Sequence, residues 1–275
     1  MTYEIDRKGE AMFISALFAS FFASQIAASE VLQWCKADMG RNNLIVNCIW
    51  GTKSHEELSG WSGIDVISAM DGSDIVLGLR GPDYLFGGSG YDRIFGGEDD
   101  DYIEGGGGDD DLYGDEGADT LRGQFGNDRL SGGLGPDLIL GGEGVDLLFG
   151  GEDDDTLYGN RAADVLFGEE GDDLLYGGRN NDIVFGGPGN DFLSGMGGAD
   201  TFLYEPGSGS DIIVDFSPSD ALDLSRFGFS TVEIAMAFMI EVDGNVIFAH
   251  KQAELLIQNY TLKKLSNQII VLDPA

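Results

Sequence analysis

A nine-residue period constrains this chain more than any other feature of its sequence. From Gly60 to Leu203, sixteen consecutive units follow one another without an insertion or a deletion. Position six of every unit is aspartate, and position eight is always isoleucine, valine, leucine or phenylalanine. Glycine dominates positions one, two and four. An acidic, glycine-rich segment without structure would not keep such a phase, so the period predicts a folded array of repeats.

The residue types of the repeat are those of a site for hard cations. Glycine at positions one, two and four allows the backbone to adopt positive φ and to turn its carbonyl oxygens towards a common centre. The aspartate adds a carboxylate. Calcium takes about six to eight oxygen ligands at flexible geometry, whereas magnesium requires a tighter octahedron and zinc prefers nitrogen or sulfur. The repeat therefore predicts bound calcium ions.

The charge of the chain points to the same class of partner. The formal net charge is −34, and the segment from Glu57 to Leu203 holds 33 acidic residues against six arginines. Nucleic acid and anionic membranes would bring further negative charge to this surface, so neither is expected as a partner. The natural counterparts of such a segment are cations.

These units resemble the GGxGxDxUx nonapeptide of RTX (repeats-in-toxin) proteins, a calcium-binding repeat. The resemblance covers more than half of the chain. It implies an all-β fold, a parallel β-roll in which two nonapeptides make one coil and residues 18 apart stack. In that family six residues form a turn, three form a short strand, and each calcium ion lies between stacked turns. Position eight then faces inward and forms a thin core.

Carried onto this chain, the resemblance assigns the calcium ligands to the aspartates at position six, helped by carbonyls of the glycine positions. One column contains Asp65, Asp83, Asp101, Asp119, Asp137, Asp155, Asp173 and Asp191, and the other contains Asp74, Asp92, Asp110, Asp128, Asp146, Asp164, Asp182 and Asp200. Eight aspartates leave seven gaps in each column, so at most about fourteen ions fit.

Both ends of the repeat are less regular than its middle. Upstream, residues 51–59 keep the phase with Glu56 in the aspartate slot, and the preceding segment VNCIW fits a first strand. After Leu203 the phase slips by two residues, and residues 206–214 give one more turn with Asp211, which completes the predicted ligands.

The remaining sequence predicts a small β-rich cap after the repeat. The segment EVDGNVIF is a hairpin signal with Asp243 and Gly244 at its turn. We therefore expect three parts, which are a leader or cap at 1–50, the calcium-binding β-roll at 51–216 and the C-terminal cap at 217–275.

The N-terminal segment allows two interpretations. Residues 12–29 form an apolar, small-residue run of signal-peptide length, which favours export, with a signal peptide of about residues 1–29. The acidic residues before it weaken the positive region that a signal peptide needs, so an amphipathic capping helix is the alternative. Cys35 and Cys48 either form one disulfide or are two buried thiols. No other stretch is long and apolar enough to span a bilayer.

Two departures from the pattern carry expectations of their own. Ala162 occupies position four, where positive φ is expected, so the sites that use this turn are the least regular. On one sheet the outward positions seven and nine are apolar and include Phe149, Phe167 and Phe185, a stripe that soluble monomers rarely expose. The aromatic residues of the tail lack another obvious core, and we expect the tail to cover this stripe.

The sequence predicts a binding module and not an enzyme. It contains no HExxH or GxSxG motif, and its numerous carboxylates already have ligand or turn roles in the repeat. We expect a secreted or cell-surface protein that folds on binding extracellular calcium and serves as a structural or adhesive module. The alternative is a non-catalytic accessory module of an extracellular polysaccharide-modifying enzyme such as an alginate epimerase. Its partners besides calcium would be an extracellular polysaccharide or a cell-surface protein.

Overall fold

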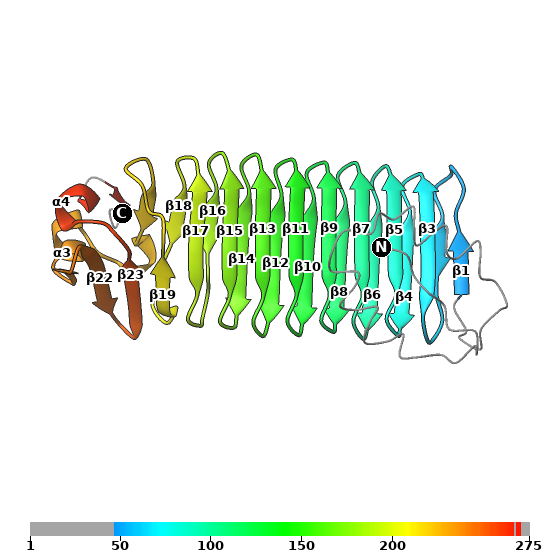
Figure 1. The fold of residues 1–275 in the computed structure, drawn as a ribbon, viewed down its shortest axis with the longest axis horizontal. Coiled ribbons are helices and arrows are strands. Elements are labelled where there is room, and N and C mark those ends of the chain that lie inside the picture. The colour runs from blue at the N-terminus through cyan, green and yellow to red at the C-terminus, as the bar shows by residue number, and fades with distance from the viewer. Residues whose placement is uncertain (1–46, 267, 271–275) are drawn as a thin grey trace, which may run out of the picture. The chain divides into compact units, whose positions relative to one another are not determined.

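The strands of this chain alternate between two parallel sheets. The structure is a computed structural model that describes residues 47–266 and 268–270. Successive strands enter the two sheets in turn and lie side by side within each sheet (Figure 1). Parallel pairing of strands that are two apart in the chain is the topology of a β-roll, so the predicted fold class is confirmed.

Sheet A contains, in spatial order, β1 (Asn47–Trp50), β3 (Asp65–Asp71), β5 (Tyr84–Ser89), β7 (Tyr102–Gly107), β9 (Thr120–Phe125), β11 (Leu138–Glu143), β13 (Thr156–Arg161), β15 (Leu174–Arg179), β17 (Phe192–Gly197), β19 (Gly209–Ile213), β23 (Ala253–Ile257), β22 (Asn245–His250) and β21 (Met239–Val242). Sheet B contains β2 (Glu57–Ser59), β4 (Ile75–Arg80), β6 (Arg93–Glu98), β8 (Asp111–Glu116), β10 (Arg129–Leu134), β12 (Leu147–Glu152), β14 (Val165–Glu170), β16 (Ile183–Phe185), β18 (Thr201–Leu203), β20 (Ala221–Asp223) and β24 (Ile269–Ile270).

Residues 18 apart stack throughout the regular repeat. Leu130 of β10 pairs with Leu148 of β12, for example, and the position-eight residues from Ile67 to Leu193 are at most 1% exposed. The thin aliphatic core predicted from position eight is therefore confirmed. The strands are longer than the family resemblance implies. Most have six residues, because the first three positions of the next unit continue the pairing, as Gly133 and Leu134 do in β10.

The two-residue slip after Leu203 changes the stacking distance but not the stacking. Phe192 of β17 pairs with Ile212 of β19, and Thr201 of β18 pairs with Ala221 of β20, both 20 residues apart. The additional turn predicted around Asp211 is thus present. At the other end, β1 forms from the predicted VNCIW segment and pairs in parallel with β3.

The last residues form the predicted β-rich cap. Strands β21 and β22 make an antiparallel hairpin, β22 pairs with β23, and β23 returns to sheet A beside β19. Asp243 and Gly244 both have positive φ, 51° and 77°, as a type I′ turn requires. Around the hairpin lie a 3-10 turn η1 (Ser225–Phe227) and two short helices, α3 (Val232–Met236) and α4 (Leu262–Leu265).

The cap has a core of its own. Phe227 and Phe229 are 3% and 5% exposed, and their rings stack 5.6 Å apart. Phe248 contacts Phe227 edge-on at 5.1 Å, and Tyr204 packs against Phe248 at 6.0 Å. The aromatic residues of the tail therefore do not need the stripe on sheet B as a core, and this part of the sequence-based expectation is wrong.

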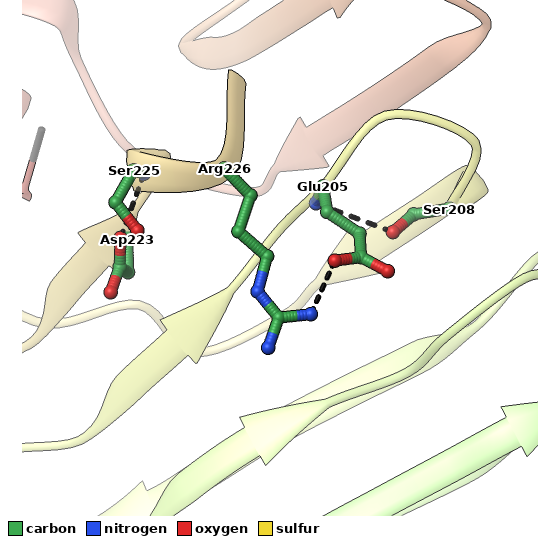
Figure 2. A network of polar contacts seen from close by, with 5 residues as sticks. All are labelled: Glu205, Ser208, Asp223, Ser225 and Arg226. Carbon is green, nitrogen blue, oxygen red and sulfur yellow. Dashed lines mark hydrogen bonds and ion pairs between the residues drawn. The ribbon is translucent and has the colours of Figure 1, made fainter. Parts of the chain in front are cut away.

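A small polar network joins the last coil of the roll to the cap. Figure 2 shows Arg226 of η1 reaching Glu205, with which it forms an ion pair. The backbone N–H of Glu205 donates to the hydroxyl of Ser208 at 3.4 Å, and the carboxylate of Asp223 accepts the N–H of Ser225 at 2.8 Å (Figure 2). These contacts hold η1 against the loop that follows β18.

The stripe on sheet B is covered mainly by its own stacking. The rings of Phe149 and Phe167 stack 5.2 Å apart, and Phe185 meets Phe167 edge-on at 6.0 Å. The guanidinium of Arg129 lies 4.4 Å from the centre of the Phe149 ring, and that of Arg226 lies 5.5 Å from the centre of the Phe185 ring. The tail therefore contributes Arg226 to the stripe, while its aromatic side chains pack in the cap.

The remaining sequence-based expectations concern the N-terminal segment, the two cysteines and membrane-spanning helices. The predicted signal peptide or capping helix at residues 12–29 lies outside the described residues, as does Cys35. Cys48 is disulfide-bonded, which excludes the free-thiol alternative for that residue. Among the described residues, no helix is long and apolar enough to cross a membrane.

Candidate metal centre

The position-six aspartates form two continuous hydrogen-bonded columns. Each aspartate is at most 4% exposed, and from Asp65 to Asp200 its backbone N–H donates to the Oδ1 atom of the aspartate one coil further on. In the first column, the N–H of Asp65 donates to Asp83 Oδ1 at 2.7 Å. The pattern continues to the last bond, which the N–H of Asp191 donates to Asp211 Oδ1. The second begins with the N–H of Glu56, which donates to Asp74 Oδ1 at 2.7 Å. One carboxylate oxygen of each aspartate is therefore committed to the fold.

The other carboxylate oxygen has no partner. A buried side-chain oxygen without a hydrogen bond occurs in sixteen of the seventeen predicted ligands, and Asp200 is the exception. The sixteen are Asp65, Asp74, Asp83, Asp92, Asp101, Asp110, Asp119, Asp128, Asp137, Asp146, Asp155, Asp164, Asp173, Asp182, Asp191 and Asp211. A buried carboxylate oxygen without a hydrogen-bond donor or a cation lowers the stability of the fold, so a column of such oxygens requires positive charge nearby.

A backbone oxygen lies beside most of these unpartnered carboxylates. At fifteen position-one glycines, from Gly60 to Gly195, an added Cβ would fall 2.0–2.6 Å from Oδ2 of the aspartate in the same unit. At eleven of them, the carbonyl oxygen of position one in the next coil is 2.4–2.9 Å from the same point. The absence of a Cβ thus keeps open a space in which a carboxylate and a carbonyl oxygen converge.

This finding corrects the reason for glycine at position one. The sequence predicts positive φ at positions one, two and four, but the position-one glycines do not adopt it. Position two does, even at Leu79 and Glu169, where φ is 85° and 76°. Position four does as well in most units, although not at Gly189 and Gly198, and Ala162 carries a Cβ at φ 77°. Position one therefore needs glycine for space alone. At positions two and four a Cβ meets both positive φ and a close backbone oxygen of the preceding coil, as at Gly88, where it would lie 1.8 Å from the Met70 carbonyl oxygen.

Burial alters the acidity of the columns. It raises the pKa of Asp101 to about 9, of Asp83 to about 8 and of Asp146 to about 6, from an ordinary value of 3.8. The hydrogen bond from the preceding coil opposes this rise in each case. For Asp83 and Asp101, neighbouring carboxylates add to it. Without a cation, Asp83 and Asp101 therefore favour the protonated form near neutral pH.

The donor set fits calcium. Carboxylate and carbonyl oxygens are hard ligands, and the columns offer no nitrogen or sulfur. Among the described residues, no three or more His, Cys, Asp or Glu side chains gather as a metal-binding group. That absence is consistent with a site that combines carboxylates with backbone carbonyls instead of assembling several acidic side chains. The unpartnered oxygens and the spaces at position one are what such an ion requires.

The second column has at each end a carboxylate that protein donors satisfy. The sequence analysis placed Glu56 in the aspartate slot at the first end and missed Asp220 at the other. Glu56 accepts the N–H of Thr52 at 2.7 Å and its hydroxyl at 2.8 Å, so both of its oxygens are used. Asp220 accepts the N–H of Asp200 at 3.0 Å and that of Ser217 at 2.7 Å. Asp220 stands 20 residues after Asp200. The slip that identified Asp211 after Asp191 would have found it if applied to the second column.

The chain matches a known repeat family over most of this region. The family described as RTX calcium-binding nonapeptide repeat (4 copies) matches residues 50–85, 77–112, 86–121, 104–139, 122–157, 140–175, 149–184 and 176–213. These overlapping segments cover more than half of the chain. The chain belongs to the RTX calcium-binding repeat family. Its two sheets are therefore a calcium-binding RTX β-roll, and the predicted resemblance is confirmed.

Two solved structures are similar to parts of this RTX chain. The extracellular lipase LipA from Serratia marcescens has 17% sequence identity and a TM-score of 0.37, with 84% of this chain and 41% of the lipase covered. The AlgE6R3 subunit of the Azotobacter vinelandii mannuronan C5-epimerase has 31% identity and a TM-score of 0.37, with 44% of this chain and 80% of that subunit covered. This chain spans less than half of the lipase. No curated protein matches it.

Proposed function

We propose that this protein is an exported RTX β-roll that folds when it binds extracellular calcium and then acts as a structural or adhesive module. The observation that carries the proposal is the unpartnered, buried carboxylate oxygen that recurs in nearly every nonapeptide. Such a regular set of oxygens is costly in the absence of cations and has no catalytic partner group in the repeat.

The seventeen position-six aspartates from Asp65 to Asp211 would hold the ions, together with the carbonyl oxygens of position one in the adjacent coil. Bound calcium would supply positive charge and bridge successive coils. The rest of the stabilisation is weak, because the core is a single aliphatic ladder and the repeat is strongly self-repelling. We propose that the calcium-binding β-roll comprises residues 51–216 and that the C-terminal cap comprises residues 217–275.

Two observations support an extracellular location. RTX repeats of the kind matched here are typical of secreted proteins. The disulfide at Cys48 fits an oxidising compartment, because cytosolic thiols are kept reduced. Outside the cell, calcium is abundant enough to drive folding, so the chain would stay extended until it is exported.

The aromatic residues on the sheet surface do not favour the alternative of a polysaccharide-binding accessory module. The Phe149 and Phe167 rings are nearly parallel, at 9°, and cover one another. Arg129 lies over Phe149 as well. A sugar ring would need an open aromatic face to stack on, and these faces are already occupied.

The proposal is tested by circular dichroism and calorimetry during a calcium titration. We expect a largely unfolded chain in excess EGTA, ordered β structure in millimolar calcium, and no equal ordering by magnesium at matched ionic strength. An unchanged β spectrum in EGTA would contradict calcium-dependent folding.

A pair of charge-matched variants tests the ligand assignment. Asp128→Asn removes a carboxylate whose oxygen is buried and unpartnered, and should lower the number of bound calcium ions. Asp109→Asn removes the same charge from an exposed side chain that accepts the Asn127 N–H at 2.8 Å. Asp109→Asn should bind calcium as the wild type does. Equal loss in both variants would mean that net charge, and not the column, decides binding.

A further inference from the structure

Among the residues that the structure describes, β21 is the last strand of sheet A at the end formed by the cap. The backbone N–H of Ala249 donates to the carbonyl of Phe238 at 3.1 Å, and the register continues with Ile240 opposite Ile247 and Val242 opposite Asn245. Bonded pairs alternate along an antiparallel ladder, so Ile240 and Val242 direct their backbone groups to β22. Phe238 directs only its carbonyl there, because its N–H donates to the carbonyl of Ala235. Met239 and Glu241 therefore direct their N–H and C=O groups outward, away from the sheet.

The side chains beside this edge are apolar and exposed. Ile240 and Val242 are 58% and 43% exposed, and they share one face because side chains alternate along a strand. Phe238 precedes the strand and is 37% exposed, and its ring packs on Phe229 and His250 of the cap at 5.4 Å and 4.1 Å. Met239, on the opposite face, is 6% exposed and belongs to the core of the cap. An unpaired strand with exposed apolar side chains is a template for pairing with another chain.

The elements next to β21 leave this face open. The Oε2 atom of Glu241 accepts the N–H of Leu262 at 3.0 Å, which brings α4 to the strand. Glu241 points to the same side as Met239, so α4 contacts the core side of β21. The side that carries Ile240 remains the most exposed part of the strand.

Charge also favours contact at this end of the molecule. Residues 217–270 carry six acidic and four basic side chains, whereas residues 57–203 carry 33 acidic side chains and six arginines. Two copies that meet at their caps avoid bringing the acidic columns together. Elsewhere on the roll, like charges would oppose such an approach.

We propose that β21 is a self-association site, where the edges of two copies pair antiparallel about a two-fold axis at Ile240. The outward groups of Met239 then bond those of Glu241 in the second copy, and Glu241 bonds Met239 in the same way. This register sets Ile240 against its own counterpart. Ile240 is the most exposed apolar side chain of the strand, and it gains an apolar neighbour from one symmetric contact.

The contact is short, so it forms a weak, concentration-dependent dimer. Sedimentation velocity in calcium, over a concentration series into the sub-millimolar range, should show a monomer–dimer equilibrium. Ile240→Lys should abolish the dimer. Ala249→Lys places the same charge on the same face but one strand inside the edge, and should leave the dimer intact. Calcium-dependent circular dichroism identical to the wild type verifies that both variants fold.

Cysteine substitution tests the register. Ile240→Cys brings two sulfurs together across the axis, because directly facing, non-hydrogen-bonded residues have Cα atoms about 4.5 Å apart, within the disulfide range. Val242→Cys should not cross-link to itself, because its two copies lie four residues out of register, roughly 13 Å along the strand.

Three results would overturn the proposal. The first is a wild-type protein that stays monomeric throughout the series, and the second is a dimer that survives Ile240→Lys. The third is a dimer in which Val242→Cys cross-links more readily than Ile240→Cys, as the present register forbids. Association of the edge with a different protein while the chain itself stays monomeric would count against self-pairing in the same way.

Discussion

Filling the space beside one aspartate should remove a calcium site without removing any ligand. In Gly132→Ala, the new Cβ would lie 2.0 Å from Asp137 Oδ2 and 2.6 Å from the carbonyl oxygen of Gly150. Ordinary contacts of a Cβ are 3.4 Å or longer, so both oxygens must move by roughly an ångström. Overpacking of this kind costs about 1–3 kcal/mol, which corresponds to a loss of about 5- to 150-fold in local affinity.

The matched control is Gly107→Ala, where an added Cβ meets nothing within 4 Å and φ is not positive. Both variants change the unfolded chain in the same way, by about 0.4–1 kcal/mol in favour of folding. Calorimetry and native mass spectrometry should show fewer bound ions, or a higher midpoint, in Gly132→Ala alone. If both variants match the wild type in stoichiometry and midpoint, the space at position one is not part of the site.

Two further predictions concern acidity and backbone conformation. Burial raises the pKa of most column aspartates above 3.8, to about 6 for Asp146 and about 9 for Asp101, so the folded state binds more protons than the unfolded one. This contribution to stability is present below about pH 4 and is lost as pH rises through 6 to 9, so in EGTA the remaining β signal in circular dichroism should be larger at about pH 5 than at about pH 8; an equal or smaller signal at pH 5 would refute it. Ala162→Gly relieves a residue held at φ 77° and should lower the calcium midpoint measured by calorimetry, and an unchanged midpoint would show that this turn tolerates a Cβ.

The sequence predicts the repeat almost completely because each of its positions has one physical requirement. Position eight is apolar in every unit, and the side chains from Ile67 to Leu193 are buried accordingly. The spacing of 18 follows from two nonapeptides per coil and is seen in every pairing of the regular repeat, such as Leu130 with Leu148. Even the slip after Leu203 was readable, because Asp211 keeps the pattern of its unit.

The rest depends on neighbours that are distant in the sequence. From the sequence, glycine at position one was interpreted as a requirement of backbone conformation. Its actual constraint is a carbonyl oxygen 18 residues further on, such as that of Gly150 beside Gly132, which the sequence of one unit does not reveal. The cap core joins Tyr204 to Phe248, a contact that no local period signals. Asp220 lies outside any nonapeptide, and only stacking on Asp200 reveals that it ends the second column.

The second unit allows the converse substitution, because its position one is alanine and already carries a Cβ. Ala69 occupies position one and is completely buried, and Asp74 in the same unit has an unpartnered Oδ2 atom. If position one needs space for an ion, Ala69→Gly should open that space beside Asp74. We expect one more bound calcium ion, or a lower midpoint, by calorimetry and native mass spectrometry.

In EGTA, Ala69→Gly should reduce the remaining β structure instead of favouring the folded state. This difference separates an effect on metal binding from a general effect on the fold. The lost methyl group and the added freedom of glycine in the unfolded chain destabilise the calcium-free coil by about 0.4–1 kcal/mol or more. The control Ala118→Gly makes the same change at an exposed position-five residue, away from the columns. If Ala69→Gly and Ala118→Gly bind calcium alike, space does not limit the first site of the second column.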